Sequence, residues 1–205
     1  MHPWRERLAR WFTPLAQRSP VGPNAISSIA LVLNLTAALC LYLGAVRPPL
    51  FLIAIVFIAV GGLLDAFDGI VARVQNRSTR FGDFLDHVSD RVSDAAMAAA
   101  WMLGSGVRQE LTIIAVIAVM LNGYIGTQIE ATWGQRNYEG LGRGEFVLTM
   151  VVCPIVSFIL AANGWIAKRF ASLTIPEWFT VVLLAFALLA IGQRLRLAAR
   201  LERSR

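Results

Sequence analysis

Charged residues are scarce in this 205-residue chain: they make up 16% of it, against about 25% in a soluble domain. Cysteine is scarce as well, because Cys40 and Cys153 are the only two and each lies inside an apolar run. Without a CxxC pair or a neighbouring histidine, the two thiols are expected to pack rather than to form a disulfide or bind a metal. This composition excludes a secreted disulfide scaffold, and an apolar content of 57% excludes a disordered tail.

Residues without charge are concentrated in six long stretches. These stretches cover residues 19–46, 48–64, 95–107, 111–129, 146–167 and 178–193. A bilayer span needs about 20 apolar residues, whereas a core helix of a soluble protein seldom has more than about 12 uncharged residues in a row. The chain is therefore predicted to be an all-α polytopic membrane protein with six transmembrane helices.

Proline and charged residues separate the stretches and set the limits of the predicted spans. The six spans are predicted over residues 24–46, 50–72, 82–105, 110–133, 145–166 and 176–197. No linker is long enough to separate domains, so residues 1–205 are predicted to form a single membrane-embedded domain. Within this domain, residues 19–197 form the six-helix bundle and residues 198–205 form a basic tail.

The amino-terminal residues 1–18 have an amphipathic pattern, and they lack the continuous apolar core and the cleavage site of a signal peptide. Their apolar residues recur at helical spacing on one face: Trp4, Leu8, Trp11, Phe12 and Leu15. With arginines on the other side, this pattern predicts a helix lying at the membrane interface beside anionic lipid. The alternative is a helix that packs on the protein's own cytoplasmic end.

Basic residues are distributed unequally between the two sides of the predicted bundle. Fifteen of the nineteen lie in the amino terminus, the region between the second and third spans, the loop between the fourth and fifth, and the carboxyl tail. Because arginine and lysine collect on the cytoplasmic side of a membrane, we expect both termini in the cytoplasm and the protein in the cytoplasmic (inner) membrane.

All six aspartates lie between residues 65 and 94. The uncharged part of the third span, residues 95–107, reaches only about 20 Å at 1.5 Å per residue, which is too short for a hydrocarbon core of about 30 Å. The turns that carry Asp86, Asp90 and Asp94 must therefore enter the membrane boundary, where each charge costs up to about 3 kcal/mol at full depth. Such residues require neutralisation by Arg91, another helix, a water-filled cavity or a bound cation.

The spacing of the aspartates favours the cation. Asp65 and Asp68 are three residues apart, so they share a face at the end of the second span. On the third span, Asp86, Asp90 and Asp94 follow one another at intervals of four residues. If the two spans lie side by side, four carboxylates converge near the cytoplasmic surface. Hard oxygen ligands in that number suit two Mg²⁺ or Mn²⁺ ions, which can hold a diphosphate.

The aspartates belong to a longer pattern, D-x-x-D-G-x-x-A-R, eight residues, G-x-x-x-D-x-x-x-D. Every fixed position of this pattern is present, as Asp65, Asp68, Gly69, Ala72, Arg73, Gly82, Asp86 and Asp90. With this signature the chain resembles the CDP-alcohol phosphotransferase (phosphatidyltransferase) family. The six predicted spans and the amphipathic amino-terminal helix also fit the architecture of that family, so the resemblance covers nearly the whole chain.

The resemblance implies an integral-membrane transferase of phospholipid biosynthesis. Such an enzyme moves a phosphatidyl group from a CDP-linked lipid, such as CDP-diacylglycerol, to the hydroxyl of a small polar alcohol and releases CMP. By the same resemblance, Asp65, Asp68 and Asp86 bind two divalent ions, Mg²⁺ or Mn²⁺. Asp90 binds one of the two and is the base for the acceptor hydroxyl, at the cytoplasmic side. A homodimer surrounded by membrane lipids is expected, without a nucleic-acid partner.

For the CDP-linked donor, the resemblance implies residues of the signature together with the start of the first span. Small residues among them let a flat base or a diphosphate approach the backbone closely, and an arginine supplies a fork for phosphate. The implied donor-binding residues are Asn24, Ala25, Ile26, Ser27, Gly69, Ala72, Arg73, Thr79 and Gly82.

For the acceptor, the run Thr-Arg-Phe-Gly at 79–82 and the pair Tyr124-Ile125 resemble the phosphatidylinositol-phosphate synthase branch, so an inositol phosphate is expected. That branch usually places a lysine and an arginine just after the Tyr-Ile pair, where this chain has Gly126 and Gln128. A weaker phosphate site, an unphosphorylated polyol or another head group therefore stay open, with inositol, glycerol 3-phosphate and serine as the alternatives. The candidate acceptor-binding residues are Arg143, Arg194, Gln128 and Arg136.

A cation channel or transporter is the alternative from another functional class, because aspartates inside a membrane often line ion pathways. A pore needs polar groups that continue across the membrane. Here the aspartates gather at one end of the predicted bundle, and none lies in the outer half of any span. The distribution therefore favours the transferase.

Overall fold

The computed structural model describes residues 11–134 and 143–203. Within these residues the chain forms six helices of 20 to 29 residues. They are α2 (Pro23–Leu43), α3 (Pro49–Val74), α4 (Arg80–Gly104), α5 (Gln109–Trp133), α6 (Arg143–Ala162) and α7 (Ile175–Arg203). Each of the six predicted spans thus corresponds to one helix, with ends that differ by a few residues. The last helix continues to Arg203, so most of the predicted basic tail is helical.

The prediction of an all-α fold did not include the short hairpin that lies between α6 and α7. The hairpin consists of β1 (Arg169–Phe170) and β2 (Leu173–Thr174), paired antiparallel. Ala171 and Ser172, at its tip, have positive φ angles of 48° and 73°. Strands of two residues leave no alternating pattern in a sequence, which explains why an all-helical fold was expected here.

Four of the helices described, α2, α3, α5 and α7, are long and apolar enough to cross a membrane. The apolar part of α6 is shorter and covers Leu148–Ala162. With 25 residues, α4 is long enough to cross a membrane, but its aspartates lower its mean hydropathy. The fold is therefore that of an integral membrane protein built from helices.

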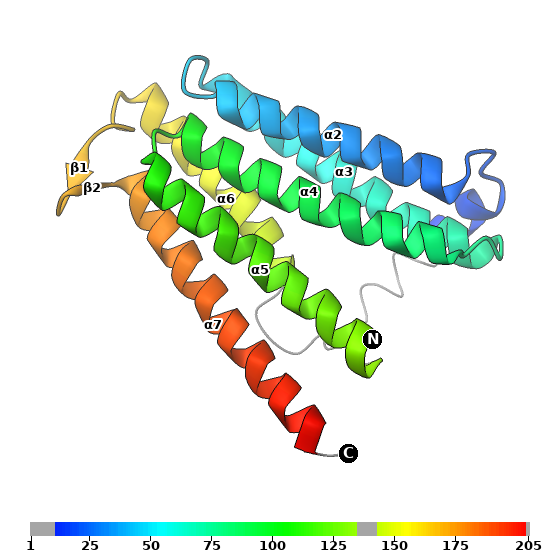
Figure 1. The fold of residues 1–205 in the computed structure, drawn as a ribbon. Helices are drawn as coiled ribbons and strands as arrows, with labels where there is room; N and C mark the ends of the chain where they lie inside the picture. Colours follow the sequence, from blue (N-terminus) through cyan, green and yellow to red (C-terminus); the bar gives the residue numbers. More distant parts are fainter. Residues whose placement is uncertain (1–10, 135–142, 204–205) are drawn as a thin grey trace.

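The helices form two groups that meet at α4 (Figure 1). α2 packs on both α3 and α4, and α5 pairs with α7 next to α4. α6 packs mainly on α3. The core between them includes Leu41, Phe51 and Trp101, all at most 1% exposed. At Gly104 the helices approach so closely that a Cβ atom would lie 2.9 Å from the backbone carbon of Leu41. A side chain at this position would separate α2 from α4.

A tight turn connects α3 to α4 and has a recognisable local cause. Asn76 adopts a left-handed conformation with φ 53°. The Arg77 N–H donates to the Ala72 carbonyl at 2.9 Å and the Asn76 N–H donates to the Arg73 carbonyl at 3.3 Å, which is a Schellman motif. Three residues later, Thr79 Oγ1 accepts from the Gly82 N–H at 3.0 Å and caps α4. The end of α3 and the start of α4 are therefore fixed next to each other.

The segment before α2 packs on the same end of the bundle. Residues 11–17 are helical, and Phe12 packs edge-on against Phe67 with ring centroids 5.8 Å apart. Gln75 Nε2 donates to the carbonyls of Ala16 and Ser19 at 2.8 and 3.0 Å. Trp11, by contrast, is 85% exposed. One side of this helix thus contacts the protein, while the first ten residues of the predicted interfacial helix lie outside the described part.

Candidate active site

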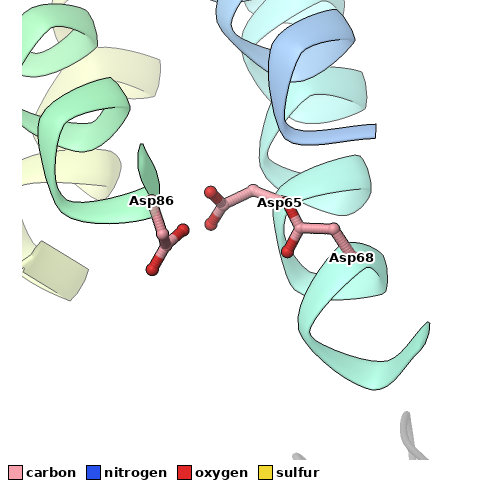
Figure 2. A group of neighbouring side chains, drawn as sticks. All are labelled: Asp65, Asp68 and Asp86. Carbon is pink, nitrogen blue, oxygen red and sulfur yellow. The ribbon is translucent and has the colours of Figure 1, made fainter. Parts of the chain in front are cut away.

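Three of the predicted aspartates converge between α3 and α4. Asp65 and Asp68 lie near the end of α3, and Asp86 lies in the second turn of α4. One carboxylate oxygen from each lies within 4.8 Å of the others. Figure 2 shows the three side chains directed toward the space between the two helices. The short turn between α3 and α4 and the packing of both helices on α2 bring the three side chains together.

Asp68 is the most buried of the three, with 6% of its surface exposed. Ser27 Oγ of α2 lies 2.5 Å from Asp68 Oδ2 and 3.1 Å from the Pro23 carbonyl oxygen. A hydroxyl has one proton to donate, and the much shorter contact assigns it to the carboxylate. Ser27 therefore orients one of the acidic groups from a third helix.

The donor set fits a divalent cation. Three carboxylates at this separation repel one another unless a positive charge lies between them. Hard oxygen ligands are those that Mg²⁺ and Mn²⁺ prefer. Each of Asp65, Asp68 and Asp86 offers an oxygen to the same point, and the side chains come from two helices that the fold holds together.

Asp90, the fourth predicted ligand, is not part of this group. It lies one turn after Asp86 on α4 and is buried, with 7% exposure. Asp94, one turn further, is also buried and lies 3.4 Å from Arg91 Nη2. The roles of Asp90 as a metal ligand and as a base thus stay predictions.

A cavity of about 240 Å³ lies next to the start of α2. Its lining contains Gly22, Pro23, Asn24, Ala25, Arg77 and Thr79. A Cβ atom on Gly82 would lie 3.1 Å from Asn24 Oδ1, so the first turns of α2 and α4 are in contact. Of the nine predicted donor-binding residues, Asn24, Ala25 and Thr79 line this cavity, and Gly82 adjoins it.

The remaining predicted donor residues are arranged differently. Ser27 faces Asp68, and Ile26 is 4% exposed and packs with Ile70 and Val71. Arg73 is exposed, and its Nη1 would lie 3.8 Å from a Cβ atom on Gly69. Ala72 is half-buried. The side chain of Ile26 therefore belongs to the core.

Arg77 lines the cavity although it was not among the predicted donor residues. The sequence left two explanations of Arg77 open, contact with the donor phosphate and the preference for basic residues on the cytoplasmic side. The signal that was available is Asn76, because asparagine is the residue that most often replaces glycine at the left-handed end of a helix. That conformation turns the chain and directs it toward the start of α2.

The structure describes the side chains of two of the four predicted acceptor residues, Arg194 and Gln128. Arg194 of α7 is half-buried and donates from Nη1 to the Asn122 carbonyl oxygen of α5. Gln128 of α5 is exposed. Arg136 and the side chain of Arg143 lie outside the described residues. The structure thus brings one predicted acceptor residue, Arg194, against α5.

The sequence matches the model of the CDP-alcohol phosphatidyltransferase family over residues 21–191. The archaetidylinositol phosphate synthase of Pyrococcus horikoshii is 28% identical over 168 residues, which is 78% of this chain and 85% of that protein. The phosphatidylinositol phosphate synthase of Mycobacterium marinum is 31% identical over 144 residues, or 67% of this chain and 59% of that protein.

Solved structures show the same fold. The phosphatidylinositol phosphate synthase of Mycobacterium tuberculosis, in complex with manganese and citrate, superposes with a TM-score of 0.68 at 22% identity, covering 91% of this chain and 88% of that one. The structure of the same synthase with CDP-DAG bound also gives 0.68, at 21% identity and with 92% and 94% covered. Since the family match takes in both helices of the acidic cluster and nearly all of the bundle, the chain belongs to the CDP-alcohol phosphatidyltransferase family of membrane enzymes.

Proposed function

We propose that this protein transfers a phosphatidyl group from CDP-diacylglycerol, or a similar CDP-linked lipid, to an inositol phosphate and releases CMP. The observation that carries the proposal is the convergence of Asp65, Asp68 and Asp86 at one end of a bundle with the family's fold. Asp65, Asp68 and Asp86 would hold divalent ions, which would neutralise the diphosphate and the charge that develops during transfer.

The donor is held at the cavity beside the acidic cluster. No side chain caps the start of α2, so its positive end is available to the diphosphate. Arg77 and Thr79 line the same cavity, and Asn24 offers an amide for the cytosine or the ribose. Arg73, on the last turn of α3, supplies a further cation. These residues bind the nucleotide part and leave the lipid chains to the membrane.

The transfer is a displacement at phosphorus. The acceptor hydroxyl oxygen forms a bond to the phosphorus that bears the lipid, and the bond from that phosphorus to the bridging diphosphate oxygen breaks. CMP leaves with the bridging oxygen, and the hydroxyl proton passes to the carboxylate of Asp90. Asp90 suits this role because it is buried one turn from Asp86 on the same helix, and a carboxylate within reach of a hydroxyl can act as a general base.

The names of the relatives support an inositol phosphate as the acceptor. One is an archaetidylinositol phosphate synthase and another a phosphatidylinositol phosphate synthase, and both align with most of this chain. Arg194 is the described cation on the acceptor side. The candidate acceptor set, Arg143, Arg194, Gln128 and Arg136, is part of this proposal.

We further propose that all six long helices span the membrane as one domain, with the acidic cluster and both termini on the cytoplasmic side. The 25 residues of α4 reach about 37 Å at 1.5 Å per residue, which is enough to cross the hydrocarbon core. Basic residues at the end of the bundle that carries the cluster support the orientation. The exposed Trp11 supports an interfacial amino-terminal helix. A homodimer is proposed from the family resemblance alone.

An acceptor panel tests the proposal. Purified protein is given CDP-diacylglycerol with Mg²⁺ or Mn²⁺ and, in turn, inositol 1-phosphate, inositol, glycerol 3-phosphate or serine. We expect CMP release with inositol 1-phosphate and a product of the mass of phosphatidylinositol phosphate. If a different acceptor supports CMP release, the proposed identity of the acceptor is wrong. If none of the acceptors supports CMP release and ions pass through proteoliposomes that contain the protein, the transferase is refuted.

A further inference from the structure

Gln75, the residue at the end of α3, holds the segment of chain that leads into α2. Its side-chain amide donates from Nε2 to the carbonyl oxygens of Ala16 and Ser19, at 2.8 and 3.0 Å. Both partners are carbonyl oxygens, which only accept hydrogen bonds, so the nitrogen of the amide and not its oxygen must face them. The two N–H groups of one side chain therefore close the carbonyl end of the helical residues 11–17.

Gln75 also lies close to both segments that form the cavity at the start of α2. The cavity lining comes from residues 22–25 and from Arg77 and Thr79. Ser19 lies three residues before the first of these segments, and Gln75 lies two residues before Arg77. One side chain therefore ties the two walls of the cavity to each other, near the point where each wall begins.

The backbone around Gln75 is itself held in place. The Gln75 N–H donates to the Val71 carbonyl at 2.9 Å, so this residue continues the last turn of α3. The next residue, Asn76, begins the left-handed turn that precedes Arg77. The Gln75 side chain is half-buried, which lessens the competition of water for its hydrogen bonds. A donor anchored in this way can fix the position of the chain that it holds.

Apolar packing holds the helix over residues 11–17, but it does not extend to the chain that follows. Phe12 and Ala16 pack with apolar residues of α2 and α3. Residues 17–19, Gln-Arg-Ser, have no apolar side chain that could continue this packing. The hydrogen bond from Gln75 to Ser19 therefore extends the attachment from the helix to the segment that enters the cavity wall.

We propose that Gln75 is a positioning residue for the CDP-linked donor, because its amide keeps residues 22–25 and Arg77 at the separation that the nucleotide diphosphate requires. Gln75 is not part of the cavity lining, so it acts through the backbone of residues 19–25 and not through contact with the nucleotide. The inference goes beyond the proposed function and rests on it for the identity of the donor.

Binding of CMP tests this inference apart from any lipid. CMP is titrated calorimetrically, with Mn²⁺ present, into the purified full chain and into the variant Gln75→Met, whose side chain has a similar length and no N–H group. Loss of the two hydrogen bonds should weaken CMP binding by about three- to tenfold. The control Gln17→Met makes the same change at an exposed glutamine of the neighbouring helical segment and should bind CMP as the unaltered protein does.

Steady-state kinetics separate a positioning role from a loss of stability. In Gln75→Met, KM for CDP-diacylglycerol should rise by a similar factor, while KM for inositol 1-phosphate stays unchanged. Glu177→Ala, at the opposite end of the bundle, serves as the control for stability, since it should lower the midpoint of thermal unfolding and leave both KM values unchanged. Gln75→Asn keeps the amide on a shorter stem that cannot reach both carbonyls, so it should resemble Gln75→Met and serves where that variant does not fold.

The outcomes distinguish this inference from the function on which it rests. Unchanged CMP affinity and unchanged KM in folded Gln75→Met protein refute the positioning role and leave the transferase intact. A higher KM for CDP-diacylglycerol without weaker CMP binding also refutes it, because Gln75 then acts on the contact with lipid. Equal losses in Gln17→Met, or no CMP binding to the unaltered protein, refute it as well. Gln75-dependent CMP binding without CMP release from any acceptor refutes the transferase and leaves the positioning role standing.

Discussion

The two ends of the bundle differ in the surroundings of their buried carboxylates. At the end next to the hairpin, Glu177 is 2% exposed, and its two carboxylate oxygens accept from Arg108 Nε at 2.8 Å and from the Thr174 N–H at 2.9 Å. At the other end, Asp65, Asp68 and Asp86 bring like charges together. A carboxylate that is satisfied within the chain stabilises the fold, whereas a group of like charges requires a ligand.

The largest effect is expected from the acidic cluster. Asp68→Asn removes one negative charge from the metal ligands and should lower transfer by about 10³-fold or more, since a bound metal supplies several kcal/mol of charge stabilisation. Metal and donor binding should weaken together, as measured by calorimetry with Mn²⁺ and with CDP-diacylglycerol. The matched control is Asp83→Asn, since Asp83 has a side chain that is 60% exposed and lies outside the cluster. Equal losses in the two variants would contradict the assignment.

Asp90→Asn separates proton transfer from binding. Loss of a general base costs about 10² to 10⁴-fold, so CMP release should fall within that range while the affinity for CDP-diacylglycerol stays nearly unchanged. A full pH–rate profile of the unaltered enzyme and the variant is the measurement. Normal turnover in the Asn variant would remove Asp90 from the role of base.

At the end of the bundle that carries Glu177, a substitution should lower the stability of the fold and leave the rate of transfer unchanged. Glu177→Ala leaves the Thr174 N–H and Arg108 without their partner and should lower the free energy of unfolding by about 2 kcal/mol. Because the Arg108 side chain is 57% exposed, water recovers part of the loss. Turnover per folded molecule should not change. Glu110→Ala, on the exposed first turn of α5, is the control, and it should leave the midpoint of thermal unfolding nearly unaltered.

The smallest effect is expected from removing the single hydrogen bond between Ser27 and Asp68. Ser27→Ala removes the hydroxyl that orients Asp68, and partners of metal ligands of this kind are worth about 10 to 100-fold in metal affinity. We expect a loss near the lower limit, measured as the Mn²⁺ concentration for half-maximal CMP release. Ser28→Ala is the control, because Ser28 Oγ donates to the Asn24 carbonyl of its own helix at 2.9 Å. A similar shift in both would assign the effect to α2 as a whole.

Sequence spacing was sufficient for the parts of the site that lie on one helix or across one turn. The intervals between Asp65 and Asp68, and between Asp86 and Asp90, follow from the period of a helix. The convergence of Asp86 with the α3 pair was expected only on the condition that the two spans lie side by side. The structure instead brings the three side chains together through the short turn at Asn76 and through α2, on which both helices pack.

Contacts between distant helices were not accessible to the same reasoning. That Ser27 faces Asp68, and that Arg91 rests on Gly123, depends on how α2 and α5 are rotated about their own axes. Apolar residues nearly surround these helices, so the hydropathy pattern does not fix the rotation. The sequence left the role of Arg77 open for a related reason, because its direction is set by one left-handed residue.

The short connection between α3 and α4 has a consequence for how the enzyme can diversify. The three carboxylates of the acidic cluster come from two helices joined by five residues, so the cluster assembles at a small loop-closure cost. The predicted acceptor residue Arg194 lies on α7 against α5, and both helices follow the cluster in the chain. If Arg194 binds the acceptor as proposed, exchanges on those later helices can alter the choice of head group while the acidic cluster is inherited unchanged.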